Sequence, residues 1–474
     1  MLVKGPRRLL LCILLLIALS FVLLRVFNAE WLPIPLPFRT ESDWTKTAFT
    51  AEADDQNSQH ETTTAAPGDA AGSLEPALKP DPFSQDQPIP LPGLPLVPST
   101  HREIVSTSTA TKTYFPLTLG SHAVINPNII PHPTLNDTWI IVAQQKKSGN
   151  PNSGWHAELV CNAVFDLATS SLSCTEPPLL LPIASTIGKK CKGKLEYVNL
   201  NVGPHDARVF YGPDVPYTVY GSNSQFTCFG QWIQDFRLLV EWDYELSSPP
   251  QFRSGTELQR PESWGEVEKN FFLFWDNEGK AYVHYNVSPR RTFAKLESDG
   301  SVGSDLAPLA AIIDDKCMNA YMLKIADTEW ESIHQATNSL SVTLCTRVDP
   351  LCFPNDDNTF IMTIFQHKSF YHYHGQYEPY VMLFKRAAPF EVYAISTKPI
   401  WINGRSHIEL PDGKGVHSEQ LYVTSMSWRN QGQKYHGYVD DVMFLAFGIE
   451  DSRTAGIDFT AGDLLQDLGL CVGL

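Results

Sequence analysis

The chain has 474 residues, and its 36 lysines and arginines against 52 aspartates and glutamates give a formal net charge of −16. Nucleic acids and anionic membrane surfaces carry the same sign of charge, so this balance excludes them as general partners. An anionic ligand would have to be met by a local cluster of cations.

The amino terminus predicts a transmembrane signal anchor. A basic segment, residues 1–8, precedes residues 9–27, which are apolar apart from Ser20 and Arg25. Basic residues before an apolar run place the tail in the cytosol and the rest of the chain in the lumen. A cleaved signal peptide is the alternative, but its cleavage site would be the poor Ala18-Leu19-Ser20, inside the run. We therefore expect a single-pass type II protein of the Golgi or endoplasmic reticulum membrane.

Residues 28–110 predict a disordered, proline-rich stem. Twelve prolines lie between Pro33 and Pro98, and the hydrophobic residues among them follow no sustained period. Such a segment cannot bury enough apolar surface to fold, and its proline-rich parts are stiff and extended. It would hold the following domain away from the membrane.

Cysteine usage agrees with a luminal domain. Eight of the nine cysteines follow the apolar run, and this even number is compatible with up to four disulfides. The absence of any C-x-x-C pair argues against a zinc ribbon or a thioredoxin-like site. Two sequons predict N-linked glycans at Asn136 and Asn286.

From residue 111 to residue 474 the chain predicts an all-β domain. Short aromatic and β-branched runs, such as TWIIVAQQ and YVMLFKR, alternate with Gly, Pro, Asn and Asp, and FFLFWDNEGKAYVHYNV predicts a hairpin. Helical periodicity is scarce, with one short segment that begins near Thr460. This number of short strands exceeds an ordinary sandwich, whereas a β-propeller holds them without long open edges.

Polar residues gather where several of these strands begin. The inner strands of a propeller and their loops line its central depression, so polar groups at their starts would converge on one pocket. The candidates are His205, Asp206 and Arg208 in NVGPHDARVF; Glu268, Lys269 and Asn270 before FFLFW; Arg290 and Arg291 after its hairpin; His334 and Asn338 in HQATNS; Tyr377 and Glu378 in HGQYEP; and Tyr438, Asp440 and Asp441 in HGYVDDVMF.

Structural alternatives stay open for these candidates. An H-D-x-R sequence is also typical of a turn cap with a surface ion pair, and Asp440 with Asp441 could cap a turn. Glu268 and Lys269 could form a solvated ion pair. The histidines of HKSFYHYHG favour an aromatic cluster over a metal site.

No metal or cofactor is expected. The D-x-D sequence, which holds the metal and diphosphate in the common metal-dependent nucleotide-sugar transferases, does not occur. The chain also lacks G-x-S-x-G, the P-loop and the Rossmann glycine fingerprint. These absences disfavour a serine hydrolase, a kinase and a nicotinamide enzyme.

Three segments resemble a known family. GPHDARVF is similar to the E-D-P-R strand start of glycoside hydrolase family 130, the five-bladed propellers that act on β-mannosides, and EKNFFLFWDNEGKAYVHYNVSPRR is similar to the K-N-W segment of related propellers. YHGYVDDVMFLAFGIED resembles the closing strand of that superfamily. The resemblance implies a five-bladed propeller. The same fold is expected of fungal β-1,2-mannosyltransferases, glycosyltransferase family 91, which are type II membrane proteins.

The chain departs from the family pattern at three positions. His205 and Ala207 stand where E-D-P-R has glutamate and proline, and Phe271 replaces the tryptophan of K-N-W. These departures leave the donor sugar and the reaction open.

The resemblance implies roles for individual residues. Asp206 matches the catalytic carboxylate, which would act in an inverting transferase as general base on the acceptor hydroxyl, and Arg208 would orient it. Lys269, with Arg290 or Arg291, would neutralise a leaving diphosphate without a metal. Asp440 matches a sugar-contacting aspartate, with Tyr438 beside it.

We therefore expect an inverting β-mannosyltransferase that moves mannose from a nucleotide sugar, such as GDP-mannose, to a glycan acceptor. A glycoside hydrolase or phosphorylase acting on β-mannosides on the same propeller is the alternative; hydrolysis needs a second carboxylate, for which Glu378 and Asp440 are candidates. A non-catalytic glycan-binding propeller is the second alternative.

Overall fold

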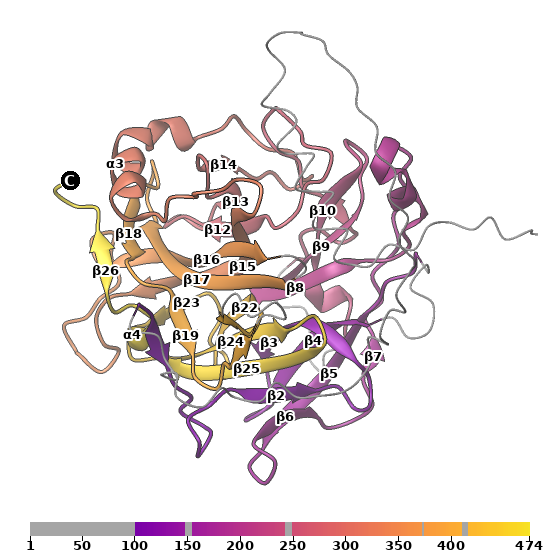
Figure 1. The fold of residues 1–474 in the computed structure, drawn as a ribbon, viewed down its shortest axis with the longest axis horizontal. Helices are drawn as coiled ribbons and strands as arrows, with labels where there is room; N and C mark the ends of the chain where they lie inside the picture. The colour runs from indigo at the N-terminus through magenta and orange to yellow at the C-terminus, as the bar shows by residue number, and fades with distance from the viewer. Residues whose placement is uncertain (1–99, 147–153, 242–248, 372–373, 410–415) are drawn as a thin grey trace, which may run out of the picture. The chain divides into compact units, whose positions relative to one another are not determined.

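A computed structural model of the chain describes residues 100–146, 154–241, 249–371, 374–409 and 416–474 (Figure 1). The predicted cytosolic tail, the anchor and the stem up to residue 99 lie outside the described residues. Within the described ranges no helix has the length and apolar character that a membrane span requires.

The described residues form an all-β, propeller-like fold, as the sequence predicts, built from five groups of mostly antiparallel strands (Figure 1). The groups are β3 (Val124–Pro131), β4 (Trp139–Gln145), β5 (Glu158–Asp166) and β6 (Ser171–Cys174); β8 (His205–Tyr211), β9 (Pro216–Asn223), β10 (Phe229–Asp235) and β11 (Thr256–Glu257); β12 (Phe272–Trp275), β13 (Ala281–Asn286) and β14 (Thr292–Lys295); β15 (Glu331–Thr343), β16 (Thr359–Tyr371), β17 (His374–Lys385) and β18 (Val392–Ser396); and β22 (Leu421–Trp428), β24 (Val442–Ile449), β25 (Arg453–Thr460) and β2 (Phe115–Thr118).

Short elements complete the described fold. They are β1 (Arg102–Ile104), which pairs with β19 (Ile400–Ile402); β7 (Leu179–Leu180) beside β5; β20 (His407–Glu409) with β21 (Val416–Ser418); β23 (His436–Tyr438) beside β15; β26 (Leu468–Leu470) beside β18; the helices α3 (Ala311–Tyr321) and α4 (Ala461–Leu464); and the 3-10 turns η1 (Gly193–Leu200), η2 (Phe236–Leu238) and η3 (Ala307–Leu309).

The strand β2 closes the ring of strand groups. Although it comes first among the five groups in sequence, it pairs with β25 of the last group, where Phe115 lies opposite Gly456. Its other end pairs with β6 of the first group, where Leu117 lies opposite Leu172. The first and last groups are thereby joined into one continuous sheet, which leaves no open edge between them.

The first strands of the groups lie side by side. β3 contacts β8 and β22, and β15 contacts β12 and β22. Because these strands are edges of their own sheets or lie close to one, their main-chain groups need partners from outside the ladder. Asn128 of β3 donates to the carbonyl of Ala207 (2.7 Å) and accepts the N–H of Val209 (3.2 Å). Asn338 of β15 bonds both main-chain groups of Met426 in the same way (2.9 and 3.0 Å).

Irregular pairing occurs near the start of four of these five strands. A β-bulge bends a strand and redirects a side chain, and bulges are common beside active sites. The register shifts lie between Ile125 and Asn128 in β3, between His205 and Arg208 in β8, between Gln335 and Ser339 in β15, and between Val423 and Ser425 in β22.

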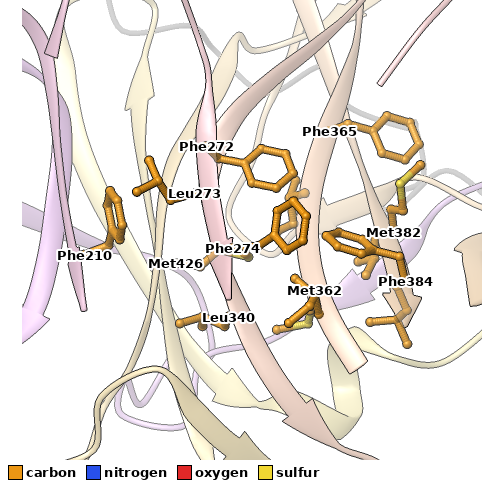
Figure 2. Close-up of a cluster of buried hydrophobic side chains, with 14 of the residues drawn as sticks. Phe210, Phe272, Leu273, Phe274, Leu340, Met362, Phe365, Met382, Phe384 and Met426 are labelled. Carbon is orange, nitrogen blue, oxygen red and sulfur yellow. The ribbon is translucent and has the colours of Figure 1, made fainter. Parts of the chain in front are cut away.

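The main hydrophobic core is formed by residues of the second, third, fourth and fifth groups (Figure 2). Phe272 and Phe274 of β12 face Phe384 of β17, with Met362 of β16 between the sheets. Each is no more than 1% exposed. Burying an aromatic or aliphatic side chain of this size stabilises the fold by about 1.5–3 kcal/mol, which is why the aromatic runs of the sequence form inner strands.

All eight cysteines of the domain are paired, which agrees with the predicted upper limit of four disulfides. The pairs are Cys161–Cys174, Cys191–Cys228, Cys317–Cys471 and Cys345–Cys352.

Cys317–Cys471 should stabilise the domain more than Cys345–Cys352. The first pair spans 154 residues and the second spans seven. Loop-closure entropy gives about 5 kcal/mol for the long loop and about 2.5 kcal/mol for the short one. We expect the Cys317→Ser/Cys471→Ser variant to have a lower melting temperature than the Cys345→Ser/Cys352→Ser variant, measured by differential scanning calorimetry. Equal melting temperatures would contradict the ranking.

Candidate active site

Asp206 stands at the start of β8, where a bulge turns it out of the sheet. Its φ is +50°, a left-handed conformation that aspartate tolerates. The N–H of Asp206 donates to Oε1 of Gln144 (2.8 Å), and that of Ala207 donates to Oε1 of Glu158 (3.0 Å). Asn126 donates to its Oδ1 (2.6 Å). Side chains of β4 and β5 thus hold the main chain of the bulge and Asn126 of β3 holds the Asp206 carboxylate, which remains exposed to solvent.

A group of cations lies next to Asp206. The buried Arg208 donates to Oδ1 of Asn270 (2.7 Å) and hydrogen-bonds the Tyr422 hydroxyl. Lys269 and Lys368 are close enough to influence each other's charge. These three cations come from three different strand groups, so only the folded chain brings them together.

Lys368 is the least solvated of these cations. It is 4% exposed in β16, and its ammonium lies 5.5 Å from the ring centre of Tyr377. Burial, and then the charge of Lys269, lower the pKa of the Lys368 ammonium to about 8, although Asp451 opposes this. Lys368 is therefore still mainly charged at pH 7.

His334 and two tyrosines form the wall of the site. The ring centres of Tyr377 and Tyr422 are 4.8 Å apart. The ring of His334 packs edge-on against Tyr377, with 5.9 Å between the ring centres. Burial, and then the charges of Lys368, Lys269 and Arg208, hold the pKa of the His334 imidazole well below its usual value. The imidazole is therefore neutral, and this wall offers aromatic faces and hydroxyls.

A second carboxyl group, Asp451, follows β24 and also faces the site. Its φ is +45°, and its Oδ1 accepts a hydrogen bond from Gln420 (3.2 Å). Water reaches the side chain, but protein atoms crowd it on most sides. This burial, and next the negative charge of Asp206, raise the pKa of Asp451, and Lys368 and Lys146 counteract them in part. The raised pKa makes the Asp451 carboxyl a candidate proton donor beside Asp206.

Glu158 holds the main chain next to Asp206 by accepting the N–H of Ala207. It is fully buried in β5, and its Oε2 has no hydrogen-bond partner among the described residues. Burial raises the pKa of Glu158 well above its usual value, and the charge of Asp206 adds to the effect. A neutral carboxylic acid therefore holds the bulge.

We call Asp206, Asp451 and the residues that surround them the central cluster. Four of them, Asn126, Asp206, Asn270 and Asp451, have positive φ values, and such conformations gather at functional sites. The cluster consists of Asn126, Asp206, Arg208, Lys269, Asn270, His334, Lys368, Tyr377, Tyr422 and Asp451. Among the described residues no group of three or more metal-ligating side chains is placed to hold a metal ion.

Six of the residues predicted from sequence belong to the central cluster. They are Asp206, Arg208, Lys269, Asn270, His334 and Tyr377. His205 lies beside it, with its ring against His156 (3.5 Å between centres) and the edge of Phe229.

Three predicted residues near the third strand group make structural ion pairs instead. Glu268 accepts two hydrogen bonds from Arg260 at 2.8 Å. The buried Arg291 pairs with Asp314 at 2.7 Å. Arg290 is exposed and pairs with Asp305 at 3.3 Å.

Asn338 and Glu378 also hold the fold. Asn338 joins β15 to β22, as described above. Glu378 follows Tyr377 in β17 and points to the opposite face, where it meets Arg405 (3.0 Å) and His101 (2.8 Å). Burial opposes its charge, but Arg405 and His101 outweigh burial and lower the pKa of Glu378 to about 2. The Glu378 carboxylate therefore has a structural role in these two ion pairs.

Tyr438, Asp440 and Asp441 lie at the opposite ends of the inner strands. Asp441 pairs with Arg347, whose guanidinium lies 4.3 Å from the Tyr438 ring centre. Asp440 accepts the N–H of Arg347 (2.7 Å). They do not converge with Asp206.

The site residues that were not predicted from the sequence are Asn126, Lys368, Tyr422 and Asp451 of the central cluster, and Glu158 beneath it. Asp451 follows an apolar strand in GIEDSR, so its signal lies at a strand end rather than at a strand start. Glu158 is a lone charge at the start of the apolar run ELVCNAVF, a pattern that could have marked it as a buried acid.

The predicted sequon residues differ in exposure. Asn136 lies in the exposed turn between β3 and β4, whereas Asn286, at the end of β13, is partly buried.

No protein family matches the chain, and no curated protein matches it. Solved structures are similar to it. The β-1,2-mannobiose phosphorylase of Listeria innocua is 11% identical, with 74% of this chain and 94% of that chain covered and a TM-score of 0.40. The catalytic domain of the Coprinopsis cinerea GH62 α-L-arabinofuranosidase is 9% identical, with 77% and 99% covered and a TM-score of 0.38. A thermostable family-43 glycoside hydrolase is 9% identical, with 72% and 91% covered and a TM-score of 0.34.

These similar proteins are carbohydrate-active enzymes. At these identities and TM-scores the likeness concerns the architecture and assigns no role to a residue of this chain.

The prediction of a nucleotide-sugar mannosyltransferase is wrong. The similar solved structures named above are glycoside hydrolases and a phosphorylase, and none is a glycosyltransferase. A hydrolase or phosphorylase, the alternative, is the class of enzyme to which those similar structures belong. It needed a second carboxyl, which the sequence analysis sought in Glu378 or Asp440 and the structure offers in Asp451.

Replacing Glu158 should change how stability depends on pH. Because the pKa of the folded state is raised, the folded chain holds a proton that the unfolded chain releases above about pH 4.5, so stability falls as pH rises. As the pH rises above about 4.5, wild type should lose up to about 1.4 kcal/mol per pH unit relative to Glu158→Gln, until the carboxyl of the folded chain also loses its proton. Urea unfolding measures this. Glu103→Gln, an exposed control, should follow wild type, and a parallel pH dependence of Glu158→Gln and wild type would contradict the assignment.

Asn338→Ala should destabilise the fold. The substitution leaves the N–H and carbonyl of Met426 buried without partners, which costs about 2–4 kcal/mol. Chemical denaturation measures the loss, with Asn319→Ala on the exposed side of α3 as the control. A change equal to that of the control would refute the structural role.

Proposed function

We propose that the chain is a glycoside-cleaving enzyme, and that its central cluster transfers a glycosyl group to inorganic phosphate. The observation that carries the proposal is the carboxyl pair Asp206 and Asp451 beside Arg208, Lys269 and Lys368. The carboxyls suit protonation of a leaving oxygen and stabilisation of a cationic transition state. The three cations can bind phosphate, an anionic nucleophile, and neutralise its charge without a metal ion.

Asp451 acts as general acid. Its raised pKa makes it a suitable donor of the proton that a departing sugar oxygen needs. Asp206, fixed at the bulge, places negative charge near the anomeric carbon, where positive charge develops as the glycosidic bond breaks. The family resemblance gives the acid role to Asp206; the difference in environment is the reason for exchanging the two roles.

The cations bind the phosphate. Lys269 and Lys368 repel each other when the site is empty, which contributes to the lowered pKa of Lys368. A phosphate between them would relieve this repulsion. One phosphate oxygen attacks the anomeric carbon, the glycosidic bond breaks, and the proton of Asp451 goes to the leaving oxygen. The products are a sugar 1-phosphate and a shortened glycan, and the proton of hydrogen phosphate restores the acid.

Hydrolysis is the second candidate, because the same carboxyl pair would serve it with Asp206 as base on a water molecule. The two reactions differ in product: phosphorolysis forms sugar 1-phosphate only when phosphate is present, whereas hydrolysis forms free sugar without it.

β-Mannosides are the proposed substrates, on the resemblance of GPHDARVF to family 130. The proposed location is the secretory lumen. The predicted anchor supports it, and so do four disulfides, which persist in oxidising compartments.

The roles of the two carboxyls can be separated with two substrates. With β-1,2-mannobiose and phosphate, Asp206→Asn and Asp451→Asn should each lower kcat by about 100- to 10,000-fold. With 2,4-dinitrophenyl β-mannoside, whose leaving group needs no proton, Asp451→Asn should retain most of its activity and Asp206→Asn should not. The alkaline limb of the wild-type pH profile, which reflects loss of the Asp451 proton, should lie above the ordinary aspartate pKa.

Asp467→Asn is the matched control, since Asp467 is also exposed with a positive φ of 55° but lies outside the central cluster. Equal loss in this control, or full activity of Asp206→Asn, would reject the mechanism. Absence of cleavage with binding of β-mannosides retained would favour the glycan-binding alternative.

A further inference from the structure

Described residues line an open pocket of about 720 Å³ at the opposite ends of the inner strands. We call it the far-end pocket. Pro213 after β8, Trp275 at the end of β12, Ser341 near the end of β15 and Asn430 after β22 all line it. The central cluster lies at the starts of these same strands. At about 3.3 Å per residue, the seven residues of β8 separate the two sites by roughly 20 Å.

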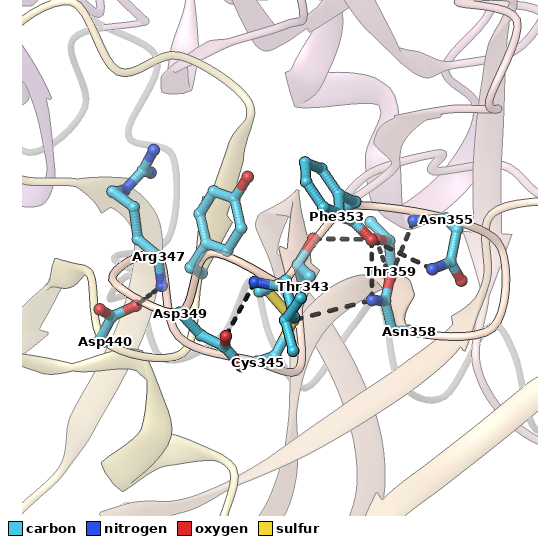
Figure 3. The surroundings of a disulfide bond; sticks show 12 residues. Thr343, Cys345, Arg347, Asp349, Phe353, Asn355, Asn358, Thr359 and Asp440 are labelled. Carbon is cyan, nitrogen blue, oxygen red and sulfur yellow. Dashed lines mark hydrogen bonds between the residues drawn. A yellow bond between two sulfur atoms is a disulfide. The ribbon is translucent and has the colours of Figure 1, made fainter.

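A disulfide-bonded loop shapes one side of the far-end pocket. Cys345 and Cys352 close the loop that follows β15, and Arg347 lies within it (Figure 3). Its backbone N–H binds Asp440, and its guanidinium is held by Asp441 and stacks on Tyr438. Arg347 is thereby a fixed part of the wall, with its charge compensated.

Of the three cationic side chains that line the far-end pocket, Arg347 and Arg386 are paired with carboxylates, and Lys434 donates to the main-chain carbonyl of Asp214. Arg386 meets Asp356 at 3.5 Å, and Arg347 meets Asp441. The carboxylate of Asp276 accepts hydrogen bonds from its own turn and from the Tyr282 hydroxyl. Such compensation gives little net attraction for an ion.

Side-chain amides dominate the remaining surface. Asn277, Asn430, Gln431 and Gln433 line the pocket, the last three from the turn RNQGQKY after β22. An amide carries both donors and an acceptor, which matches the hydroxyl groups of a sugar. Asn277 and Gln433 already donate to Asp356 and Asp441, so the turn residues Asn430 and Gln431 carry most of this capacity. The aromatic side chains of Trp275 and Tyr438 border the same space.

Two buried polar atoms of the lining lack partners. Oγ of Ser341 and Nε of Arg386 make no hydrogen bond with any described residue. Buried polar groups are nearly always satisfied, so both atoms are free to bond a ligand. His436 adds no charge, because burial, and then Arg386 and Arg347, lower the pKa of its imidazole to about 4.

We infer that the far-end pocket binds a neutral saccharide of two or three residues, independently of the central cluster. Paired charges disfavour an ion, the amide-rich lining disfavours an apolar ligand, and the volume falls within the 300–1,000 Å³ typical of small-molecule sites. The inference does not rest on the proposed reaction. The pocket would hold a second stretch of glycan while the central cluster acts elsewhere.

Calorimetric titration of the protein with mannotriose, cellotriose, laminaritriose and chitotriose tests the inference. We expect at least one to bind, and the Asn430→Ala/Gln431→Ala variant to weaken that binding by about tenfold through lost hydrogen bonds. Both residues are exposed, so the fold should be unaffected. Asn319→Ala/Gln251→Ala, two exposed amides outside the pocket, is the matched control and should bind as wild type does.

Asp206→Asn keeps the two proposals apart. Binding at the far-end pocket should survive this substitution, and cleavage of β-1,2-mannobiose should survive Asn430→Ala/Gln431→Ala. If none of the four saccharides binds, or if binding is lost in Asp206→Asn but unchanged in Asn430→Ala/Gln431→Ala, the inference is overturned.

Discussion

The fold and the site both depend on hydrogen bonds from side chains to main-chain groups of the inner strands. The first strands of neighbouring groups meet without a shared ladder, so their N–H and carbonyl groups need other partners. Asn128 and Asn338 supply them between groups, and Gln366 bonds both main-chain groups of Val423 (2.9 and 3.0 Å). A side-chain amide can do this because it carries a donor and an acceptor in one plane.

The same device places the reactive carboxyl. At the bulge of β8 the ladder is interrupted, and Gln144 and Glu158 replace it for two successive N–H groups. A charged glutamate at the buried position would repel Asp206, but a neutral acid does not. The apolar surroundings of Glu158 are therefore compatible with a negative charge on Asp206. The charge of Asp206 in turn favours the protonated form of Asp451. Stability and site electrostatics are coupled through these three carboxyls.

Much of the architecture could be predicted from local pattern. The aromatic and β-branched runs marked the strands because an inner strand must bury both faces, and the turn of FFLFWDNEGKAYVHYNV marked a hairpin that the structure contains as β12 and β13. Asp206, Arg208 and Asn270 were found because they precede or begin such strands. Asp451 and Lys368 were not, because one lies at a strand end and the other within a long strand, and only the packing of different groups brings them to the same place.

The sequence by itself determined which segments are strands, that the cysteines could all pair, and that several polar residues stand at strand starts. Tertiary structure alone decided which of those residues meet. Glu268 and Glu378 were predicted to be site carboxylates, yet the folded chain pairs Glu268 with Arg260 and Glu378 with Arg405 and His101. Strand direction separated Asp440 from Asp206 by the length of an inner strand. The physical reason is that a residue's chemistry depends on its surroundings, and in a ring of sheets those surroundings come from other groups.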